Sequence, residues 1–144
     1  MNNNILKECI DNVLEELEQE HRDMYKSLIS TITRLERELE QFQTARYNPD
    51  DYGYSFDDDQ FDIIITNHQL QLERNRLTKL MFNSKSDAFT GRICQRLLTN
   101  AISHREIVEE MMELRIINEN VYNEESKKLM NHHNHIKERL DDME

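Results

Sequence analysis

Apolar residues recur along the first third of the chain at steps of three, four or seven positions. Leu28, Leu35 and Phe42 belong to this series. Such spacing keeps one side of an α-helix apolar. The series stops before Pro49, because the residue that precedes a proline disfavours the helical conformation. The pattern therefore predicts a helix over residues 4–46, about 60 Å long at the rise of an α-helix.

The middle of the chain carries shorter versions of the same pattern. Ile63, Leu70 and Leu77 stand seven positions apart with further apolar residues beside them, which predicts a helix over residues 61–82. A short polar break follows, and apolar residues then return at helical spacing. They predict a second, shorter helix over residues 87–100.

The last part of the chain opens on a signature of helix starts. Ser103 and Glu106 form a Ser-x-x-Glu pattern, in which the two side chains cap each other's free backbone amides. An apolar stripe that includes Leu114 and Ile117 follows at steps of three and four. We therefore predict a long terminal helix over residues 103–141.

Turn-forming residues are scarce, and this scarcity selects the fold class. The 144 residues include 2 Gly and 1 Pro, and 37% of them are hydrophobic. Sandwiches, barrels and doubly wound sheets need frequent turns, whereas so few apolar residues suit long helices with narrow apolar seams. The expected fold is all-α, a single helical domain over residues 1–144. It is an elongated helical bundle or an antiparallel coiled-coil hairpin, with two long terminal helices and one or two shorter middle helices.

Residues 47–60 differ from the rest of the chain. They hold the only proline, one of the two glycines, five aspartates and no basic residue, which predicts a loop. Aromatic rings offer contact area and carboxylates attract cationic partners, so one hypothesis is that this acidic-aromatic loop binds a basic surface of another protein. The alternative is a solvated linker whose aromatic side chains fold back on the helices. The candidate partner-binding residues are Tyr47, Asp50, Asp51, Tyr52, Tyr54, Phe56, Asp57, Asp58 and Asp59.

Charge is distributed unevenly along the chain. The formal net charge is −11, which disfavours nucleic acids and anionic lipid surfaces as general partners. Residues 63–102, however, carry six basic and two acidic side chains. These basic side chains either pair with the acidic first and last helices or form a face that grips phosphate. The candidate basic face, within residues 74–96, consists of Arg74, Arg76, Lys79, Arg92 and Arg96.

Three histidines near the C-terminal end, His132, His133 and His135, are the strongest candidates for metal ligands. His132 and His135 share one helical face, but a structural zinc site takes about four ligands and no cysteine lies nearby. We therefore expect no metal site and no cofactor. No catalytic motif occurs either, and narrow helical seams seldom create the pocket that acid–base chemistry needs, so we expect no enzymatic activity.

The sequence also indicates a cellular compartment. Its longest aliphatic run is three isoleucines, far below the roughly 20 residues that span a bilayer. The first residues lack the basic and apolar regions of a signal peptide. Cys9 and Cys94 lie far apart on predicted helices, which favours reduced thiols. We expect an intracellular protein, cytoplasmic or nuclear.

Together these features favour an interaction protein over an enzyme. The leading hypothesis is a non-enzymatic adaptor or complex subunit that binds another protein through its apolar helical seam and the acidic-aromatic loop. The partner would be another helical subunit, a basic protein surface or a second copy of the chain. An alternative is an acidic inhibitor that imitates nucleic acid and occupies a DNA- or RNA-binding protein. A third hypothesis is nucleic-acid binding through the basic face of residues 74–96.

Overall fold

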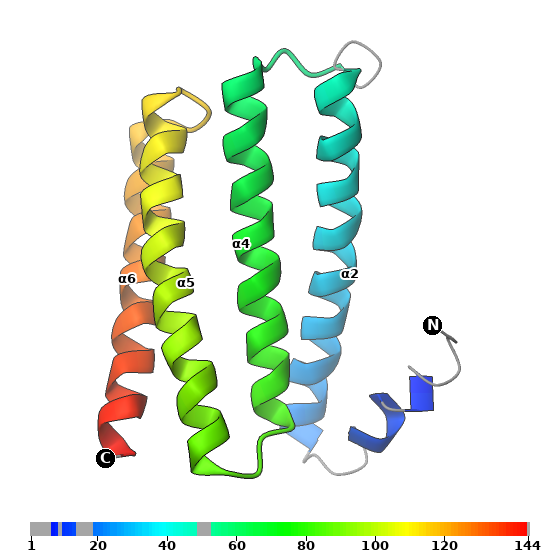
Figure 1. Cartoon of the computed structure of the whole chain (residues 1–144), viewed down its shortest axis with the longest axis vertical. Helices are drawn as coiled ribbons and strands as arrows, with labels where there is room; N and C mark the ends of the chain where they lie inside the picture. The colour runs from blue at the N-terminus through cyan, green and yellow to red at the C-terminus, as the bar shows by residue number, and fades with distance from the viewer. Residues whose placement is uncertain (1–6, 9, 14–18, 49–52, 144) are drawn as a thin grey trace.

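The computed structural model describes residues 7–8, 10–13, 19–48 and 53–143, and it confirms the all-α prediction. Long helices account for most of the described chain and form a bundle (Figure 1). Residues 7–8 and 10–13 are also helical, whereas the other residues of the predicted helix before position 19 lie outside the described ranges. The long helices are α2 (Gln19–Tyr47), α4 (Asp58–Phe82), α5 (Asp87–Glu113) and α6 (Glu119–Asp142).

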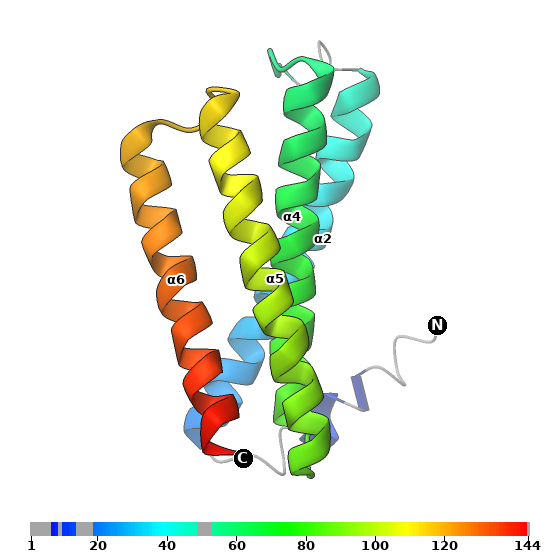
Figure 2. The same ribbon diagram turned by 60° about the vertical axis from the view of Figure 1, so that its left-hand side comes forward.

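Consecutive helices run antiparallel and lie side by side (Figures 1 and 2). α2 packs on α4, α4 packs on α5, and α5 packs on α6, whereas α2 and α6 make no extensive contact in the described chain. The helices therefore form an open row and not a closed ring. The start of α2 and the end of α6 nevertheless lie at the same end of the molecule, as Figures 1 and 2 both show.

Polar side chains cap the starts of the helices. Before α4, the Asp57 carboxylate accepts a hydrogen bond from the Gln60 backbone N–H at 2.8 Å, and the Gln60 side chain accepts one from the Asp57 N–H at 3.0 Å. The Gln60 amide also donates to the carbonyl oxygen of Leu114 at 3.0 Å, which ties the start of α4 to the end of α5. Ser86 caps α5 by accepting from the Phe89 N–H. Because of the Asp57 cap, α4 begins three residues earlier than predicted.

The predicted division of the C-terminal half is wrong. No boundary separates a helix 87–100 from a helix 103–141, because α5 continues through these positions to Glu113. Ser103 lies inside α5, so the Ser-x-x-Glu pattern starts no helix. The break falls at residues 114–118, between α5 with 27 residues and α6 with 24. α2 and α4 have 29 and 25 residues, so the described terminal helices are not distinctly longer than the middle ones.

Backbone hydrogen bonds explain why the chain turns after Glu113. Arg115 has a left-handed backbone with φ of 61°, and its N–H donates to the Met112 carbonyl oxygen at 3.0 Å. The next N–H, that of Ile116, donates to the Met111 carbonyl oxygen at 2.8 Å. These two bonds make a Schellman motif, whose left-handed position is usually glycine. Because arginine occupies it here and the apolar spacing continues across the turn, the sequence pattern does not reveal the break.

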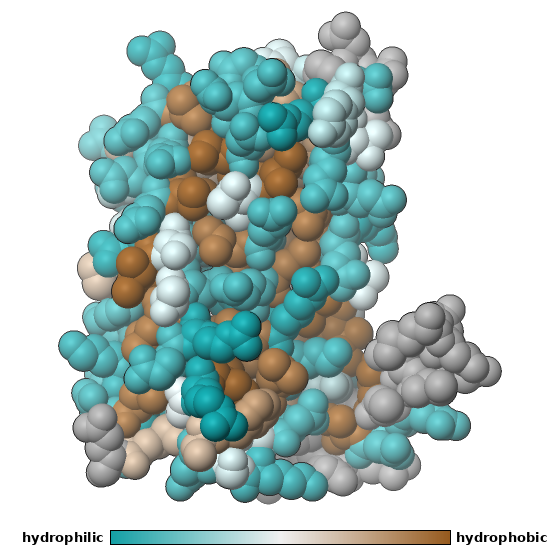
Figure 3. Space-filling model, in the orientation of Figure 1, coloured by the Kyte–Doolittle hydropathy of each residue, from teal (hydrophilic) through white to brown (hydrophobic). Residues whose placement is uncertain are grey.

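The core consists of apolar clusters between neighbouring helices. One cluster joins α4, α5 and α6, and another joins α2 to α4. On the face drawn in Figure 3, hydrophobic side chains appear in bands between hydrophilic ones, as expected for helices that bury narrow stripes. In α2 the stripe passes through Tyr25 and Leu35, while the adjacent Met24 is 54% exposed. The clusters contain Leu77, Ile93, Cys94, Leu97 and Ile136, and Ile32, Leu35 and Leu72.

Candidate functional site

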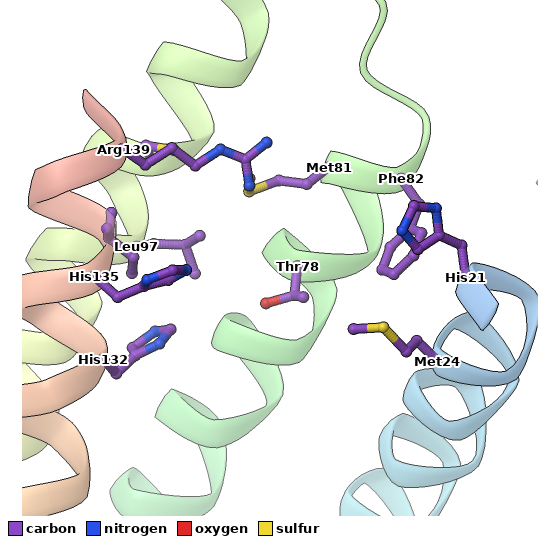
Figure 4. Close-up of a pocket in the computed structure, with 11 residues that line it drawn as sticks. His21, Met24, Thr78, Met81, Phe82, Leu97, His132, His135 and Arg139 are labelled. Atoms are coloured by element: carbon purple, nitrogen blue, oxygen red, sulfur yellow. The ribbon is translucent and has the colours of Figure 1, made fainter. Parts of the chain in front are cut away.

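Side chains from α2, α4, α5 and α6 line one cleft at the end of the molecule where α2 begins and α6 ends (Figure 4). This α2–α6 cleft has a volume of about 480 Å³. α4 and α5 form its floor, because they pack on each other between the outer helices, and α2 and α6 form its walls. The lining residues are His21, Met24, Thr78, Met81, Phe82, Cys94, Leu97, His132, His135, Ile136 and Arg139.

The floor of the α2–α6 cleft is apolar. Leu97 of α5 belongs to the buried core, with 3% of its surface exposed, and Met81 of α4 packs half-buried against that core. Ile136 of the α6 wall is 5% exposed and belongs to the same core. Met24 projects from the α2 wall (Figure 4). Thioether side chains adapt to irregular surfaces, so this floor can accept apolar side chains of a partner.

The rim of the cleft is basic although the chain is acidic overall. His132, His135 and Arg139 project from α6 toward α4, and His21 lies opposite them at the start of α2 (Figure 4). None of the described residues that line the cleft is a carboxylate, whereas the whole chain has 29 acidic and 18 basic side chains. Of the described residues that line the cleft, Arg139 carries a permanent positive charge, which suits an apolar ligand with a negative group.

Burial favours the neutral forms of two groups in the cleft. Burial lowers the pKa of His132, and the positive charges of Arg74 and of the neighbouring histidines lower it further. Burial also raises the pKa of the Cys94 thiol, against a smaller opposing effect of Arg139. Because nucleophilic cysteines act as thiolates, this protonated and fully buried thiol serves as a packing residue.

A second hollow, of about 310 Å³, lies further along α4, α5 and α6. Arg74 and His104 line it. His104 is 5% exposed, and its Nε2 lies 2.7 Å from Oδ1 of Asn67. Burial, with smaller contributions from the charges of Arg74 and His132, lowers the pKa of His104 to about 4. The neutral imidazole therefore donates its Nε2–H to the Asn67 amide oxygen.

The aromatic side chains of the acidic-aromatic loop pack on the helices. The rings of Tyr54 and Phe56 stack with their centroids 5.8 Å apart. Tyr54 also contacts Phe42 of α2 at 5.4 Å and Phe61 of α4 at 6.2 Å. Tyr47, at the end of α2, is by contrast 80% exposed. Tyr54 and Phe56 therefore fold back on the helices, as the linker alternative predicts, whereas Tyr47 stays at the surface.

The carboxylates of the loop lie at the start of α4. Asp57 is the N-cap, and Asp58 and Asp59 are exposed in the first turn, where negative charge complements the helix dipole. These three carboxylates therefore have a role in starting α4. The other candidate residues, Asp50, Asp51 and Tyr52, lie outside the described residues.

The basic candidates within residues 74–96 contact different neighbours. Arg74 faces the hollow beside α5 and α6, while Arg76 lies 3.5 Å from the Glu36 carboxylate of α2. The second contact pairs the basic middle of the chain with its acidic first helix, one of the two arrangements that the charge pattern predicts. Of the others, Lys79 is half-buried, Arg92 lies 5.9 Å from the centre of the Phe89 ring, and Arg96 is exposed.

The α2–α6 cleft is the feature that the sequence did not reveal. Thr78 and Met81 share a face of α4, and His132, His135 and Arg139 share a face of α6, as their spacing by three or four positions requires. This spacing is visible in the sequence. The packing of the helices decides which of their faces stay uncovered. The spacing of residues along the chain does not predict this packing.

The histidine cluster divides between the cleft and its surroundings. His132 and His135 line the cleft, and His133 is not among its lining residues. Within the described ranges, no group of three or more His, Cys, Asp or Glu side chains is arranged to hold a metal ion. The chemistry of the cleft is therefore that of an apolar floor with a basic rim.

Among the helices that the structure describes, none combines the length and the apolar character needed to cross a membrane. Comparison with protein-family models, with curated protein sequences and with solved structures finds no match to the chain.

Proposed function

We propose that the protein is a non-enzymatic interaction protein, an adaptor or complex subunit, which binds a helix of a partner protein at the α2–α6 cleft. One observation carries the proposal: α2 and α6 form the two walls of one cleft but do not pack extensively on each other. In a closed bundle each helix covers apolar stripes of two neighbours. Here the apolar side chains that line the cleft and keep exposed surface, the half-buried Met81 of α4 and the 54% exposed Met24 of α2, are left for a further helix.

The dimensions of the cleft fit this mode of binding. Helix-in-groove recognition inserts apolar side chains that recur at every third or fourth position of an amphipathic helix. A cleft of about 480 Å³ lies in the range that encloses a small ligand, so it accommodates a few such side chains while the helix itself rests on the walls. Met24 and Met81 are the adaptable contacts on opposite sides of that space.

The contacts of the other candidate residues favour the cleft over the remaining hypotheses. Tyr54 and Phe56 are engaged with the helices, which leaves less of the acidic-aromatic loop for a partner. Arg74 lines the hollow beside α5 and α6, whereas Arg76 lies beside Glu36 of α2, which argues against one continuous basic face for nucleic acid. The proposal therefore places the partner at the apolar seam and not at the loop.

Selection from a library of short helix-forming peptides tests the proposal. Met24→Glu removes an apolar contact of the cleft at a side chain that is already 54% exposed. We expect this variant to bind the selected peptides with about tenfold lower affinity, because central apolar contacts carry most of the binding energy. The matched control is Met130→Glu, which changes a 37% exposed methionine outside the cleft and should leave their affinity nearly unchanged.

Two results would count against the proposal. One is a selection that yields no peptide, and the other is a set of peptides that respond equally to both variants. Sedimentation of the chain alone adds a further check. A stable dimer that excludes the selected peptides would assign the cleft to a second copy of the chain.

A further inference from the structure

Two side chains of opposite charge line the second hollow, between α4, α5 and α6. Arg74 lines it from α4 and Glu125 from α6. The Glu125 carboxylate lies 3.6 Å from Nζ of Lys128 on its own helix, and Arg74 has no ion pair or hydrogen bond to another described residue. A guanidinium and a carboxylate therefore border the same space without forming an ion pair with each other.

The charges that line the second hollow balance at pH 7. Burial lowers the pKa of the Arg74 guanidinium and the charge of Glu125 raises it, but arginine stays protonated in proteins. His104 also lines the hollow, and it is neutral at pH 7 because burial, more than the nearby positive charges, lowers its pKa to about 4. One positive and one negative charge remain among the described lining residues. A zwitterion satisfies both charges, whereas a simple anion or a simple cation is repelled by one of them.

Amide side chains stand beside Arg74 on α4. Asn67 and Gln71 line the hollow with it, and their spacing by three or four positions puts all three residues on one face of the helix. The Oδ1 atom of Asn67 lies 2.7 Å from Nε2 of His104. The N–H groups of Asn67 and the amide of Gln71 therefore add hydrogen-bonding capacity to the wall that carries the guanidinium.

Apolar side chains form the rest of the wall. They are Val108 and Met111 of α5, Ile117 before α6 and Val121 of α6. Met111 and Ile117 are half-buried and Val121 is 38% exposed, so apolar surface remains for a ligand. The volume of about 310 Å³ lies at the lower end of the roughly 300–1,000 Å³ that is typical of ligand pockets. This volume indicates a small ligand.

We propose that the second hollow binds a free α-amino acid with an apolar side chain. Arg74 donates hydrogen bonds to the ligand carboxylate in a fixed fork. Glu125 accepts hydrogen bonds from the ligand ammonium group, in place of its weak surface contact with Lys128. The ligand side chain lies against the apolar wall. This site does not depend on the partner helix proposed for the α2–α6 cleft.

Methyl NMR of the full chain with L-leucine as the probe tests the site. Met111 lines the second hollow and Met24 lines the α2–α6 cleft, so their methyl signals report on the two spaces separately. We expect leucine to shift the Met111 signal with a saturable curve and to leave the Met24 signal in place. Leucinamide keeps only the positive charge and 4-methylpentanoate keeps only the negative charge. Each should bind about tenfold more weakly than leucine, because one charged hydrogen-bonding partner is lost.

Two variants separate the roles of the charges. Arg74→Gln should weaken leucine by about tenfold but not leucinamide, because the carboxylate of Glu125 is retained. Glu125→Gln should weaken leucine and spare 4-methylpentanoate. Binding of the spared probe also shows that each variant is folded. The matched controls are Arg76→Gln and Glu124→Gln, at exposed residues that do not line the hollow, and both should bind leucine as the unchanged protein does.

Several results would overturn the site. One is the absence of a saturable Met111 shift with valine, leucine, isoleucine and methionine alike. Another is equal affinity for leucine, leucinamide and 4-methylpentanoate, which would mean that the hollow takes up only the apolar part. A third is leucine affinity that stays the same in Arg74→Gln and Glu125→Gln. A shift of Met24 instead of Met111 would place the ligand in the cleft and likewise contradict the proposal.

Discussion

At the scale of single residues, α5 buries two polar side chains that hold it against α4. Asn100 is 1% exposed, and its amide donates to the Leu70 carbonyl oxygen at 2.9 Å and to the Glu73 carboxylate at 2.8 Å. One turn later, His104 contacts Asn67. Buried polar groups cost free energy unless they are hydrogen-bonded, so these contacts favour one register of α5 on α4. A pattern of apolar residues cannot predict them.

His104 makes the stability depend on pH. Its pKa is about 4 in the folded protein against 6.5 in a model compound, so the unfolded chain binds more protons between these values and stability falls as the pH drops through this window. From this residue alone, the free energy of unfolding in urea should be about 2 kcal/mol lower at pH 5 than at pH 7. His104→Gln should remove that part of the pH dependence. An unchanged pH dependence in this variant would show that His104 titrates normally.

Arg115 occupies a backbone conformation that suits glycine. Its φ of 61° costs an L-residue roughly 1–2 kcal/mol, and glycine regains part of this while losing more entropy on folding. Arg115→Gly should therefore raise the free energy of unfolding by about 0.5–1 kcal/mol, measured by urea unfolding. Arg115→Ala is the control and should bring no such gain. If both variants have the same free energy of unfolding, the left-handed conformation at position 115 does not reduce the stability of the protein.

At the scale of helices, the two glycines should respond in opposite directions to alanine. Gly91 lies within α5 and a Cβ there would meet nothing within 4 Å, so Gly91→Ala should stabilise the protein by about 1 kcal/mol through helix propensity. Gly53 also has open space around it but has φ of +72°, so Gly53→Ala should destabilise by about 1 kcal/mol. Thermal unfolding of the two variants checks the pair. A midpoint that falls for Gly91→Ala would contradict the placement of α5.

Also at this scale, the sequence predicted some helix boundaries and missed others for identifiable reasons. The end of the first helix near Arg46 and the end of the 61–82 helix at Phe82 agree with α2 and α4, since Pro49 and a polar break mark them. The division between α5 and α6 was missed, because a hydrogen-bonded turn built around Arg115 carries no glycine or proline. Asp57 was predicted as a partner contact, but it caps α4. The sequence alone does not distinguish the two roles, because a carboxylate that precedes a helix suits either of them.

At the scale of the whole molecule, charge and packing act together. Ion pairs of both polarities join α2 to α4: Arg76 of α4 lies 3.5 Å from Glu36 of α2, and Arg46 of α2 pairs with Asp62 of α4 at 2.6 Å. Exposed pairs of this kind contribute about 0–1 kcal/mol each to the free energy of unfolding. They therefore help to select which helices lie next to each other more than they add to the stability of the fold. The open row that results leaves α2 and α6 as walls of a cleft whose rim is basic.

Methionine methyl NMR tests most directly whether this cleft is the partner site. The chain has seven methionines; Met24 and Met81 line the cleft, and Met112 and Met130 do not. The methyl signals are recorded while a selected helical peptide is added to the full chain. We predict that the signals of Met24 and Met81 shift with a common saturation curve while those of Met112 and Met130 stay in place. Shifts confined to Met112 and Met130, or none at saturating peptide, would contradict the assignment of the α2–α6 cleft as the binding site.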